Sequence, residues 1–383
     1  MPRLSTALLR HAYTIDPLLP LLLRPCRNLL AAQNELRWLR EYVDMVARSR
    51  RMGHRKADRK SLLRQLARER ASGKPLQYIL GTEYFGDLEI RCRPGVLIPR
   101  QETAASITYL VRLIRNAQSL PPELRVLDLC TGTGCIPLLF HHEFCSARKD
   151  VALRVLGVDI SEKATELAED NLRQVQRRGD CLDQGEMGFM LADVLIDPFG
   201  DQTLKPPSVK AAFNFNRKPV FWDVLTSNPP YISPSAYWKT TTRSVRGFEP
   251  KLALVPPPAP GNCGIEQGDL FYPRILHIAR DVEAKIVLLE VADMNQALRV
   301  AKMARELNIF DGVEIWRDQP DQIDDSSSAE LQGFPVIGQG NGRSVLCWRG
   351  IGATWLGKGA SRNNLNLIDD HRLFRSYWRS PFG

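Results

Sequence analysis

The chain of 383 residues is 44% hydrophobic and 25% charged, and its formal net charge is +9. These values are typical of a globular protein and leave room for one large domain or two of ordinary size. A membrane-spanning helix is excluded, because no apolar stretch approaches the roughly 20 residues that a span needs. The run from Leu18 to Leu23 is interrupted by Pro20 and followed by Arg24.

The eight cysteines are scattered along the chain, without a C-x-x-C pair and without a matching pair of histidines. This spacing argues against a zinc site, and a chain of this size does not need a disulfide framework. We therefore expect no bound metal, and free thiols in a reducing compartment.

The first residues have the character of a targeting segment. Residues 1–12 contain Arg3, Arg10 and His11 among leucines and small hydroxylated residues, and Asp16 is the first carboxylate. A basic, amphipathic start is typical of organelle-targeting peptides, although a frayed terminus would have the same composition.

A basic helical region follows. Between Asn28 and Ala71, apolar residues recur at three- and four-residue spacing with no glycine or proline before Gly53, which predicts two or three helices. Residues 1–78 hold 17 Lys and Arg against 6 Asp and Glu, whereas the remaining residues have a net charge of −2. The basic run from Arg48 to Arg70 indicates contact with a polyanion, either RNA or the ribosome or an acidic protein face, unless it is a solvated helix face.

Short strands are predicted next. Gly73 and Pro75 end the helical region, and Tyr84 to Ile98 predicts two strands separated by the turn Arg93-Pro94-Gly95. We expect a helical substrate-docking domain over residues 13–81 and a β-hairpin connector over residues 82–100.

Strands and helices alternate from residue 101 to about 350. The predicted strands are 125–129, 153–158, 189–191, 221–227 and 285–291, with a final pair at 313–316 and 344–348. The predicted helices are 104–117, one that begins near 135, 161–177, 269–280 and 293–307. This alternation predicts an α/β domain with a mostly parallel sheet and helices on both faces. The polar segments 179–188, 200–219 and 320–333 are expected to be surface loops. We assign no role to the tail 351–383.

The first group of residues that indicates chemistry is a glycine turn. A buried strand runs into Thr131, Gly132, Thr133 and Gly134, and a helix follows. Glycines let the backbone approach a ligand closely, and a helix N-terminus favours polar or anionic groups. Asp159 ends the next predicted strand, where an acid reaches the ribose hydroxyls of a nucleoside in a doubly wound sheet. A dinucleotide site would need a third glycine in place of Pro137, so a nucleoside without pyrophosphate fits better.

The second group follows a later strand. Asn228, Pro229, Pro230 and Tyr231 come directly after the strand that ends at Ser227, at the edge where open α/β sheets bind ligands. The two prolines leave rigid carbonyl acceptors, Asn228 adds a side-chain carbonyl, and Tyr231 can stack on a flat group.

These parts suit methylation of a planar amino nitrogen. Two acceptors that grip both hydrogens of such a group favour the pyramidal form that attacks, and well-oriented reactants reach effective molarities of about 10⁵ M or more. We therefore interpret Asn228 to Tyr231 as catalytic. Neither a metal nor a covalent intermediate is required.

Together these residues resemble the class I (Rossmann-like) S-adenosylmethionine-dependent amino-methyltransferases. Three further segments, 75–81 (PLQYILG), 96–103 (VLIPRQET) and 248–254 (FEPKLAL), resemble the HemK-type peptide chain release factor glutamine methyltransferases. The similarity runs from about residue 28 to 350. The chain departs from the family pattern at Cys130, where glycine is more usual, and at Val194, where an aromatic residue is often found.

The resemblance implies both a cofactor and a substrate. S-adenosylmethionine would contact Thr131 to Gly134, Asp159 and Asn228, with Asp193 on the adenine side. The turn from Asn228 to Tyr231 would hold the glutamine amide of the Gly-Gly-Gln motif in a release factor, and the helical domain would dock the body of that factor. With the acid-free start, the resemblance implies an enzyme of the mitochondrial matrix, or otherwise a cytoplasmic one.

Two alternatives stay open. The same Asn-Pro-Pro-Tyr turn suits the exocyclic amine of adenine in RNA or DNA, although base flipping in a duplex demands a basic groove and residues 79–383 have a net charge of −2. A non-catalytic, ribosome-associated factor on a methyltransferase fold would use the basic N-terminal region instead.

Overall fold

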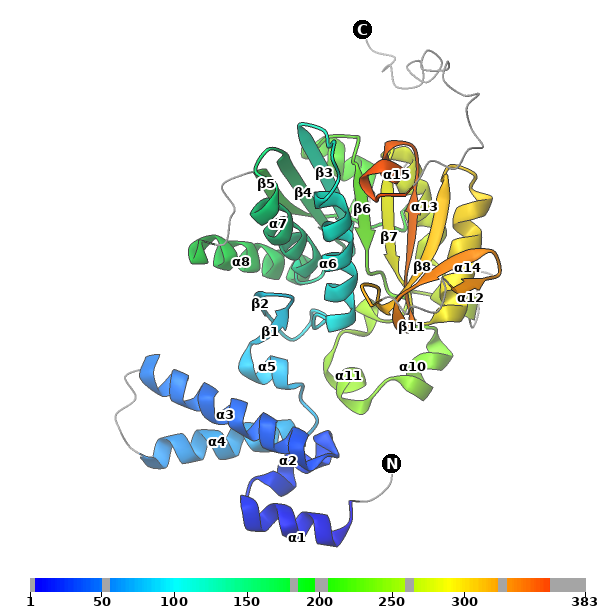
Figure 1. The fold of residues 1–383 in the computed structure, drawn as a ribbon. Helices are drawn as coiled ribbons and strands as arrows, with labels where there is room; N and C mark the ends of the chain where they lie inside the picture. The colour runs from blue at the N-terminus through cyan, green and yellow to red at the C-terminus, as the bar shows by residue number, and fades with distance from the viewer. Residues whose placement is uncertain are drawn as a thin grey trace, which may run out of the picture.

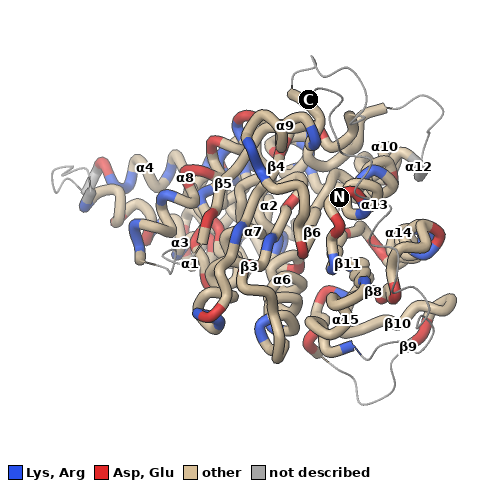
Figure 2. Tube along the Cα trace, turned by 90° about the horizontal axis from the view of Figure 1, so that it is seen from above, with Lys and Arg blue, Asp and Glu red and all other residues tan. Residues whose placement is uncertain are grey.

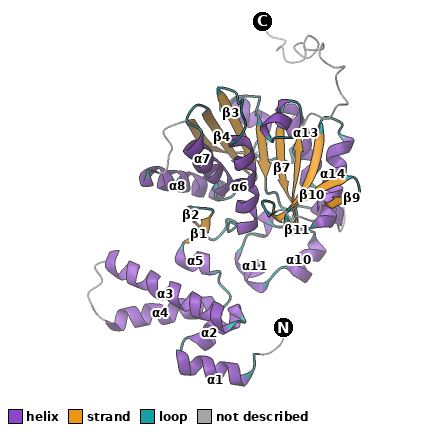
Figure 3. Cartoon of the chain, in the orientation of Figure 1, coloured by secondary structure: helices purple, strands orange, loops and turns teal. Residues whose placement is uncertain are grey.

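A computed structural model describes residues 4–49, 56–179, 185–196, 206–258, 265–322 and 329–358. An all-helical N-terminal region leads through a small hairpin into a larger α/β region (Figures 1 and 3). Within the described ranges, no helix combines the length and the apolar character needed to cross a membrane.

The N-terminal region is a cluster of helices with its own apolar core. Its helices are α1 (Thr6–Ile15), α2 (Leu19–Cys26), α3 (Leu29–Ser49), α4 (Lys56–Ala71) and the short α5 (Leu76–Leu80). Leu22, Leu36 and Leu39 are buried in this core, as the helical spacing of leucines predicts. Pro20 lies in the first turn of α2, where a missing N–H group is tolerated.

The described part of the segment predicted as a targeting peptide, residues 4–12, belongs to this helical cluster in the structure. The Ser5 hydroxyl caps α1 by accepting a hydrogen bond from the Leu8 N–H at 3.1 Å. Ala12 is buried, and Leu8 and Leu9 pack against the same core. Residues 6–15 therefore contribute apolar contacts to the helical region, whatever their part in targeting.

The connecting hairpin turns earlier than the sequence predicts. Strand β1 (Thr82–Phe85) pairs with β2 (Leu88–Arg91), and the chain reverses at Gly86, where φ is 56°. The predicted turn at Arg93-Pro94-Gly95 exists, since the Val96 N–H donates to the Arg93 carbonyl at 3.2 Å, but it follows the hairpin. The prediction was wrong because both glycines have positive φ, and only the residues beside Gly86 pair.

The α/β region is built on one sheet. Among the described residues the sheet has nine strands in the order β5-β4-β3-β6-β7-β11-β8-β10-β9. The strands are β3 (Glu123–Leu129), β4 (Ala152–Asp159), β5 (Gly185–Leu191), β6 (Val224–Ser227), β7 (Ile286–Glu290), β8 (Gly312–Gln319), β9 (Ala329–Leu331), β10 (Phe334–Ile337) and β11 (Gln339–Trp348). The first five in spatial order are parallel, and β11 lies antiparallel between β7 and β8. The predicted α/β class, with its final strand pair, is confirmed.

Helices cover both faces of the sheet (Figure 1). The helices of this region are α6 (Gln101–Arg115), α7 (Cys135–Ala147), α8 (Glu162–Arg178), α9 (Val209–Phe215), α10 (Pro234–Thr240), α11 (Arg243–Phe248), α12 (Ile265–Gly268), α13 (Phe271–Asp281), α14 (Met294–Glu306) and α15 (Ile351–Trp355), with a 3₁₀ turn at Lys251–Ala253. Successive residues of a strand point to opposite faces. In β3, Val126 packs into the core beneath α6 and α7, whereas Leu127 packs into the core beneath α13 and α14. Burial on both faces explains why these strands are continuous apolar runs.

Part of the segment predicted as a loop at 200–219 is instead a buried helix. In α9, Val209, Ala212 and Phe213 are buried in the core, and Ser208 caps the helix by accepting from the Ala211 N–H at 3.3 Å. Tertiary burial of a short apolar segment overrides the flanking prolines and lysines. The other two predicted loops also contain strand residues, in β5 and β9, while residues 180–184, 197–205 and 323–328 lie outside the described part.

The first residues of the predicted tail form a short helix. In α15, Trp355 is buried in the core beneath α6 and α7, and Leu356 follows it there. Residues 359–383 are outside the described part of the chain.

Candidate active site

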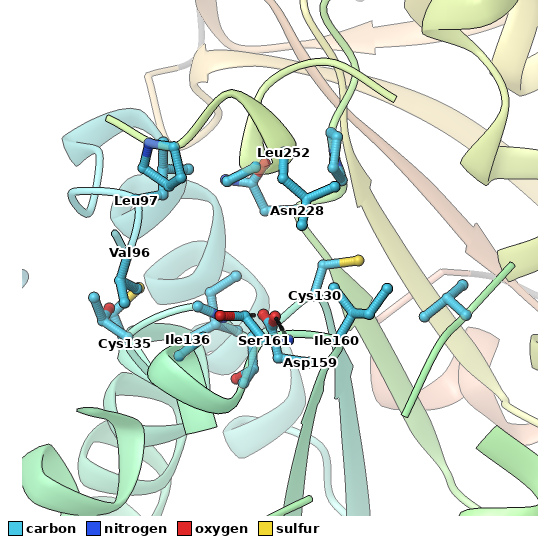
Figure 4. Close-up of a pocket in the computed structure, with 18 of the residues that line it drawn as sticks. Val96, Leu97, Cys130, Cys135, Ile136, Asp159, Ile160, Ser161, Asn228 and Leu252 are labelled. Carbon is cyan, nitrogen blue, oxygen red and sulfur yellow. Dashed lines mark hydrogen bonds between the residues drawn. The ribbon is translucent and has the colours of Figure 1, made fainter. Parts of the chain in front are cut away.

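The predicted site residues meet at one edge of the sheet, around a cavity of about 320 Å³. The carboxyl ends of the parallel strands β3, β4 and β6 lie side by side there, which brings together three segments that are far apart in sequence. The predicted residues that line the cavity are Thr131, Gly132, Thr133, Asp159, Asp193, Asn228 and Pro230. Gly134, Pro229 and Tyr231 lie behind this lining. Figure 4 shows Asn228 and Asp159 on opposite sides of the drawn pocket.

The two glycines of the turn have different tasks. A Cβ added at Gly132 would meet no protein atom within 4 Å, so the missing side chain leaves the cavity open to a ligand. A Cβ at Gly134 would lie 2.9 Å from the Phe189 ring and 3.0 Å from Ala168, so this glycine allows α7 to pack closely. Both glycines have positive φ, and so does Cys130, at 61°. Cys130 thus has a left-handed backbone conformation that glycine adopts readily, which explains why glycine is more usual at this position in the family.

Asp159 connects the turn to the end of β4. Its Oδ2 accepts a hydrogen bond from the Gly132 N–H at 2.8 Å, and its Oδ1 accepts from the Ser161 N–H at 3.0 Å. Burial raises the pKa of Asp159, and these backbone donors oppose that shift. Each carboxylate oxygen keeps a further lone pair. A carboxylate that lines the cavity in this way is suited to accept hydrogen bonds from a vicinal diol.

The region around Asp193 is an apolar slot. Asp193 accepts a hydrogen bond from the Leu195 N–H at 2.8 Å through its Oδ1. Val194, Leu195 and Phe271 line the cavity beside it. Phe271 is thus an aromatic residue in the lining near Val194, and a flat, apolar ring is suited to such surroundings.

The Asn228 turn is held against the glycine turn by side-chain hydrogen bonds. The Thr226 hydroxyl donates to Asp128 Oδ1 at 2.7 Å, and the Ser227 hydroxyl donates to the Leu129 carbonyl at 2.8 Å. Burial raises the pKa of Asp128 to about 7, against the hydrogen bond from Thr226. The end of β6 is thereby joined to the end of β3, and Asn228 is kept next to the glycine turn.

Tyr231 faces the interior of the protein. Its hydroxyl donates to Glu290 Oε1 at 3.1 Å, its ring packs against the core, and its carbonyl accepts from Gln296 Nε2 at 3.2 Å. Burial raises the pKa of its phenol. In this structure Tyr231 therefore holds the turn in place, and its ring does not line the cavity.

The wall opposite the glycine turn comes from the connector and from the residues after α11. Leu97, Ile98 and Leu252 supply an apolar lining. Arg100 also lines the cavity and donates to Glu249 Oε1 at 2.8 Å, and the Ile98 N–H donates to Glu249 Oε2 at 3.1 Å. The local sequence pattern of these residues indicated no function for this wall. Its only signal was the likeness of segments 96–103 and 248–254 to the HemK-type family.

Among the residues that the structure describes, no group of three His, Cys, Asp or Glu side chains is placed to hold a metal ion.

Comparisons with known proteins agree with this geometry. No protein-family profile matches the chain. The mitochondrial MRF1 N(5)-glutamine methyltransferase MTQ1 of Saccharomyces cerevisiae is 34% identical over 259 residues, which cover 67% of this chain and 68% of that protein. A release factor glutamine methyltransferase of Nitratidesulfovibrio vulgaris is 30% identical over 257 residues, 67% of this chain and 73% of that protein.

Likeness to solved structures is weaker. The N-terminal domain of human METTL16 in complex with SAH is 15% identical with a TM-score of 0.38, and covers 73% of this chain and 81% of that one. The order of the strands therefore identifies the fold, and the sequence relatives identify the family. By that measure the chain belongs to the release factor glutamine methyltransferases.

Proposed function

We propose that this protein transfers a methyl group from S-adenosylmethionine to the side-chain amide nitrogen of the glutamine in the Gly-Gly-Gln motif of a mitochondrial release factor. The observation that carries the proposal is the position of Asn228. It lines the same cavity as Gly132 and Asp159, at the end of the neighbouring strand. A planar amide held by Asn228 would thus lie beside a nucleoside held by the other two residues.

The described residues fit S-adenosylmethionine. A cavity of about 320 Å³ falls within the usual range of ligand sites, about 300–1,000 Å³. Asp159 would accept from the ribose hydroxyls, the slot beside Asp193 would take the adenine, and the open face of Gly132 would let the ligand approach the backbone. When bound, this cofactor supplies an electrophilic methyl carbon.

The protein's own part is to orient the amide nitrogen. The lone pair of an amide is delocalised, so the nitrogen attacks only when its two hydrogens are held in acceptors and the group can become pyramidal. The Asn228 side-chain oxygen supplies one acceptor, and a backbone carbonyl of the turn supplies the other. Leu97, Ile98 and Leu252 keep water from competing for these groups.

The proposal is tested by incubating a recombinant mitochondrial release factor with the protein and cofactor, and then analysing tryptic peptides by mass spectrometry. The Gly-Gly-Gln peptide should gain one methyl group. Asn228→Ala should lower the rate at least 100-fold, because it removes an acceptor that acts at the reacting nitrogen. Asn214→Ala, at an exposed position on α9, is the matched control and should leave the rate unchanged.

The same assay separates the proposal from adenine methylation. Methyl transfer to RNA or DNA, with an unmodified Gly-Gly-Gln peptide, would support the alternative. The names of the relatives, which specify glutamine, favour the peptide.

The mitochondrial location is supported by the name of the yeast relative and by the basic start of the chain. Arg10 is exposed on α1, so Arg10→Glu, combined with Arg3→Glu, alters the charge of the segment and spares the buried Ala12. This variant should remain in the cytosol, whereas the exposed Arg24→Glu should still be imported into the matrix. Import of both variants would contradict a targeting role for residues 1–12.

A further inference from the structure

A line of buried hydrogen bonds runs from the end of β7 to the Asn228 amide. Glu290, the last residue of β7, accepts from the Thr103 hydroxyl at 2.5 Å through Oε2 and from the Tyr231 hydroxyl at 3.1 Å through Oε1. The Asn228 Nδ2 in turn donates to Thr103 Oγ1 at 3.4 Å. Glu290 and Thr103 are each only 4% exposed. Glu290, Thr103 and Asn228 come from three parts of the chain that are distant in sequence.

When Glu290 is ionised, the hydrogen bonds that join Glu290, Thr103 and Asn228 can run in only one direction. A carboxylate only accepts hydrogen bonds, so the single proton of the Thr103 hydroxyl is committed to Glu290. Thr103 Oγ1 then has only lone pairs to offer Asn228. The amide must turn its NH₂ group toward Thr103, and its carbonyl oxygen Oδ1 is left for the cavity that Asn228 lines.

The groups around Glu290 act on its pKa in opposite directions. Burial is the larger effect and raises the pKa of Glu290, whereas the hydrogen bonds from Thr103 and Tyr231 and the positive charge of Arg343 oppose that shift and favour the carboxylate. Arg343 is itself held by Asp318, which accepts from its Nε at 2.8 Å.

We propose that Thr103 and Glu290 are positioning residues that fix the Asn228 amide with its oxygen, and not its nitrogen, toward the substrate amide. The inference rests on the proposed function, in which Asn228 accepts a hydrogen from the attacking nitrogen. A reversed Asn228 would direct an NH₂ donor at an NH₂ donor, so a mixture of both orientations would lower the fraction of enzyme ready to react.

The kinetic test uses Thr103→Val, which keeps the shape of the side chain and removes its hydroxyl, with Thr103→Ser as the matched rescue. Thr103→Val should lower kcat about tenfold or more. Its KM for the release factor and its Kd for S-adenosylmethionine should stay within about twofold. Thr103→Ser should restore kcat. In Glu290→Gln the new amide can donate to Thr103, which would reverse the direction of the hydrogen bonds through Thr103. This variant should therefore also lower kcat. A purely structural role would instead lower thermal stability and leave kcat unchanged.

A second measurement does not depend on turnover. In protein labelled with ¹⁵N at asparagine, the Asn228 side-chain signals are identified by their absence from Asn228→Asp. One Asn228 Nδ2 proton should exchange slowly with water in the wild type and in Thr103→Ser, and rapidly in Thr103→Val. Asn171, whose buried Nδ2 donates to the Thr133 carbonyl at 2.9 Å, is the internal control and should stay protected throughout.

The two measurements distinguish the possible failures. If Thr103→Val changes neither kcat nor the Asn228 exchange, the positioning role is overturned. If the wild type shows the expected protection but methylates no release factor, the order of hydrogen bonds stands and the proposed function fails.

Discussion

At the scale of single residues, the site depends on backbone conformations that few side chains tolerate. Gly132 and Gly134 have φ of 56° and 75°, in the left-handed region. An L-residue there costs about 1–2 kcal/mol. The turn nevertheless accepts Cys130 at a φ of 61°, where the thiol is partly buried against the core. Conformational cost alone therefore does not decide which positions need glycine, and the space around each missing Cβ matters as well.

Alanine substitutions at the two glycines should separate these effects. Gly134→Ala drives a methyl group to 2.9 Å from the Phe189 ring, so it should reduce the free energy of unfolding by about 2–3 kcal/mol. The methyl group of Gly132→Ala meets no protein atom within 4 Å, so this variant should lose only about 1 kcal/mol of its free energy of unfolding. Its methyl group occupies ligand space, so it should weaken S-adenosylmethionine binding at least tenfold.

Urea unfolding and isothermal titration calorimetry measure the two quantities. The assignment of tasks would be wrong if Gly132→Ala bound the cofactor normally, or if Gly134→Ala were the more stable of the two variants.

At the scale of elements, the helix α9 shows how packing decides structure that local pattern leaves ambiguous. Residues 209–215 are flanked by prolines and lysines. They form a helix because Phe213 fits into the core with its ring 5.9 Å from that of Trp222. Phe215, two positions away, points outward and is 72% exposed. The helix also follows Asp193, whose backbone bridges to Ser208, so its packing supports the adenine side of the cavity.

The two phenylalanines of α9 provide a matched pair of mutations. Phe213→Ala should lower the free energy of unfolding by about 3–5 kcal/mol, because it removes a buried aromatic ring and leaves a cavity. Phe215→Ala should change it by less than about 0.5 kcal/mol. Chemical denaturation of both variants gives the comparison, and equal effects would show that α9 is not packed on the sheet.

At the scale of the whole molecule, charge is divided between the two parts. Lys and Arg recur along α4 (Figure 2), and Lys60, Arg64 and Arg68 are exposed at four-residue spacing on that helix. None of these three forms an ion pair with a residue in the described part of the chain. Their neighbours Arg59 and Arg70 do, with Asp44 at 3.2 Å and Glu35 at 2.8 Å. The three unpaired cations are therefore available to a negatively charged partner.

The helical part is also attached near the site. The Ser244 hydroxyl on α11 donates to the Gly73 carbonyl at 2.6 Å. Gly73 follows α4, and Glu249, which follows α11, supports the cavity wall through Arg100. The segment after α4 is thus joined through α11 to residues that support the cavity wall.

Reversal of the three charges should reveal the docking partner. Lys60→Glu combined with Arg64→Glu and Arg68→Glu should raise KM for an intact release factor at least tenfold at low salt, and less at high salt, because the attraction is screened. Methylation of a short Gly-Gly-Gln peptide should be unaffected. Lys302→Glu, exposed on α14, is the control.

An unchanged KM for the intact factor would exclude Lys60, Arg64 and Arg68 as its docking surface. If the variant lost affinity for RNA while KM stayed constant, the basic region would serve RNA or ribosome contact instead.

Much of the site could be predicted because its signals are local. A buried strand is an apolar run, and glycine or proline after it imposes a turn by the stereochemistry of its own backbone. Gly132, Asp159 and Asn228 were therefore recognisable one by one, and parallel strand ends bring such residues to one edge. The hairpin turn was misplaced because Gly86 and Gly95 give the same local signal.

The sequence by itself determined the alternation of strands and helices, the two turns and the uneven charge, since each depends on neighbouring residues. Only the tertiary structure decided that Thr103 meets both Glu290 and Asn228, that Arg100 meets Glu249, that α9 is buried and that Tyr231 faces inward. Those contacts join residues more than a hundred positions apart or depend on which side of a segment finds the core. Such pairings follow from the topology of the sheet, and no short stretch of chain encodes it.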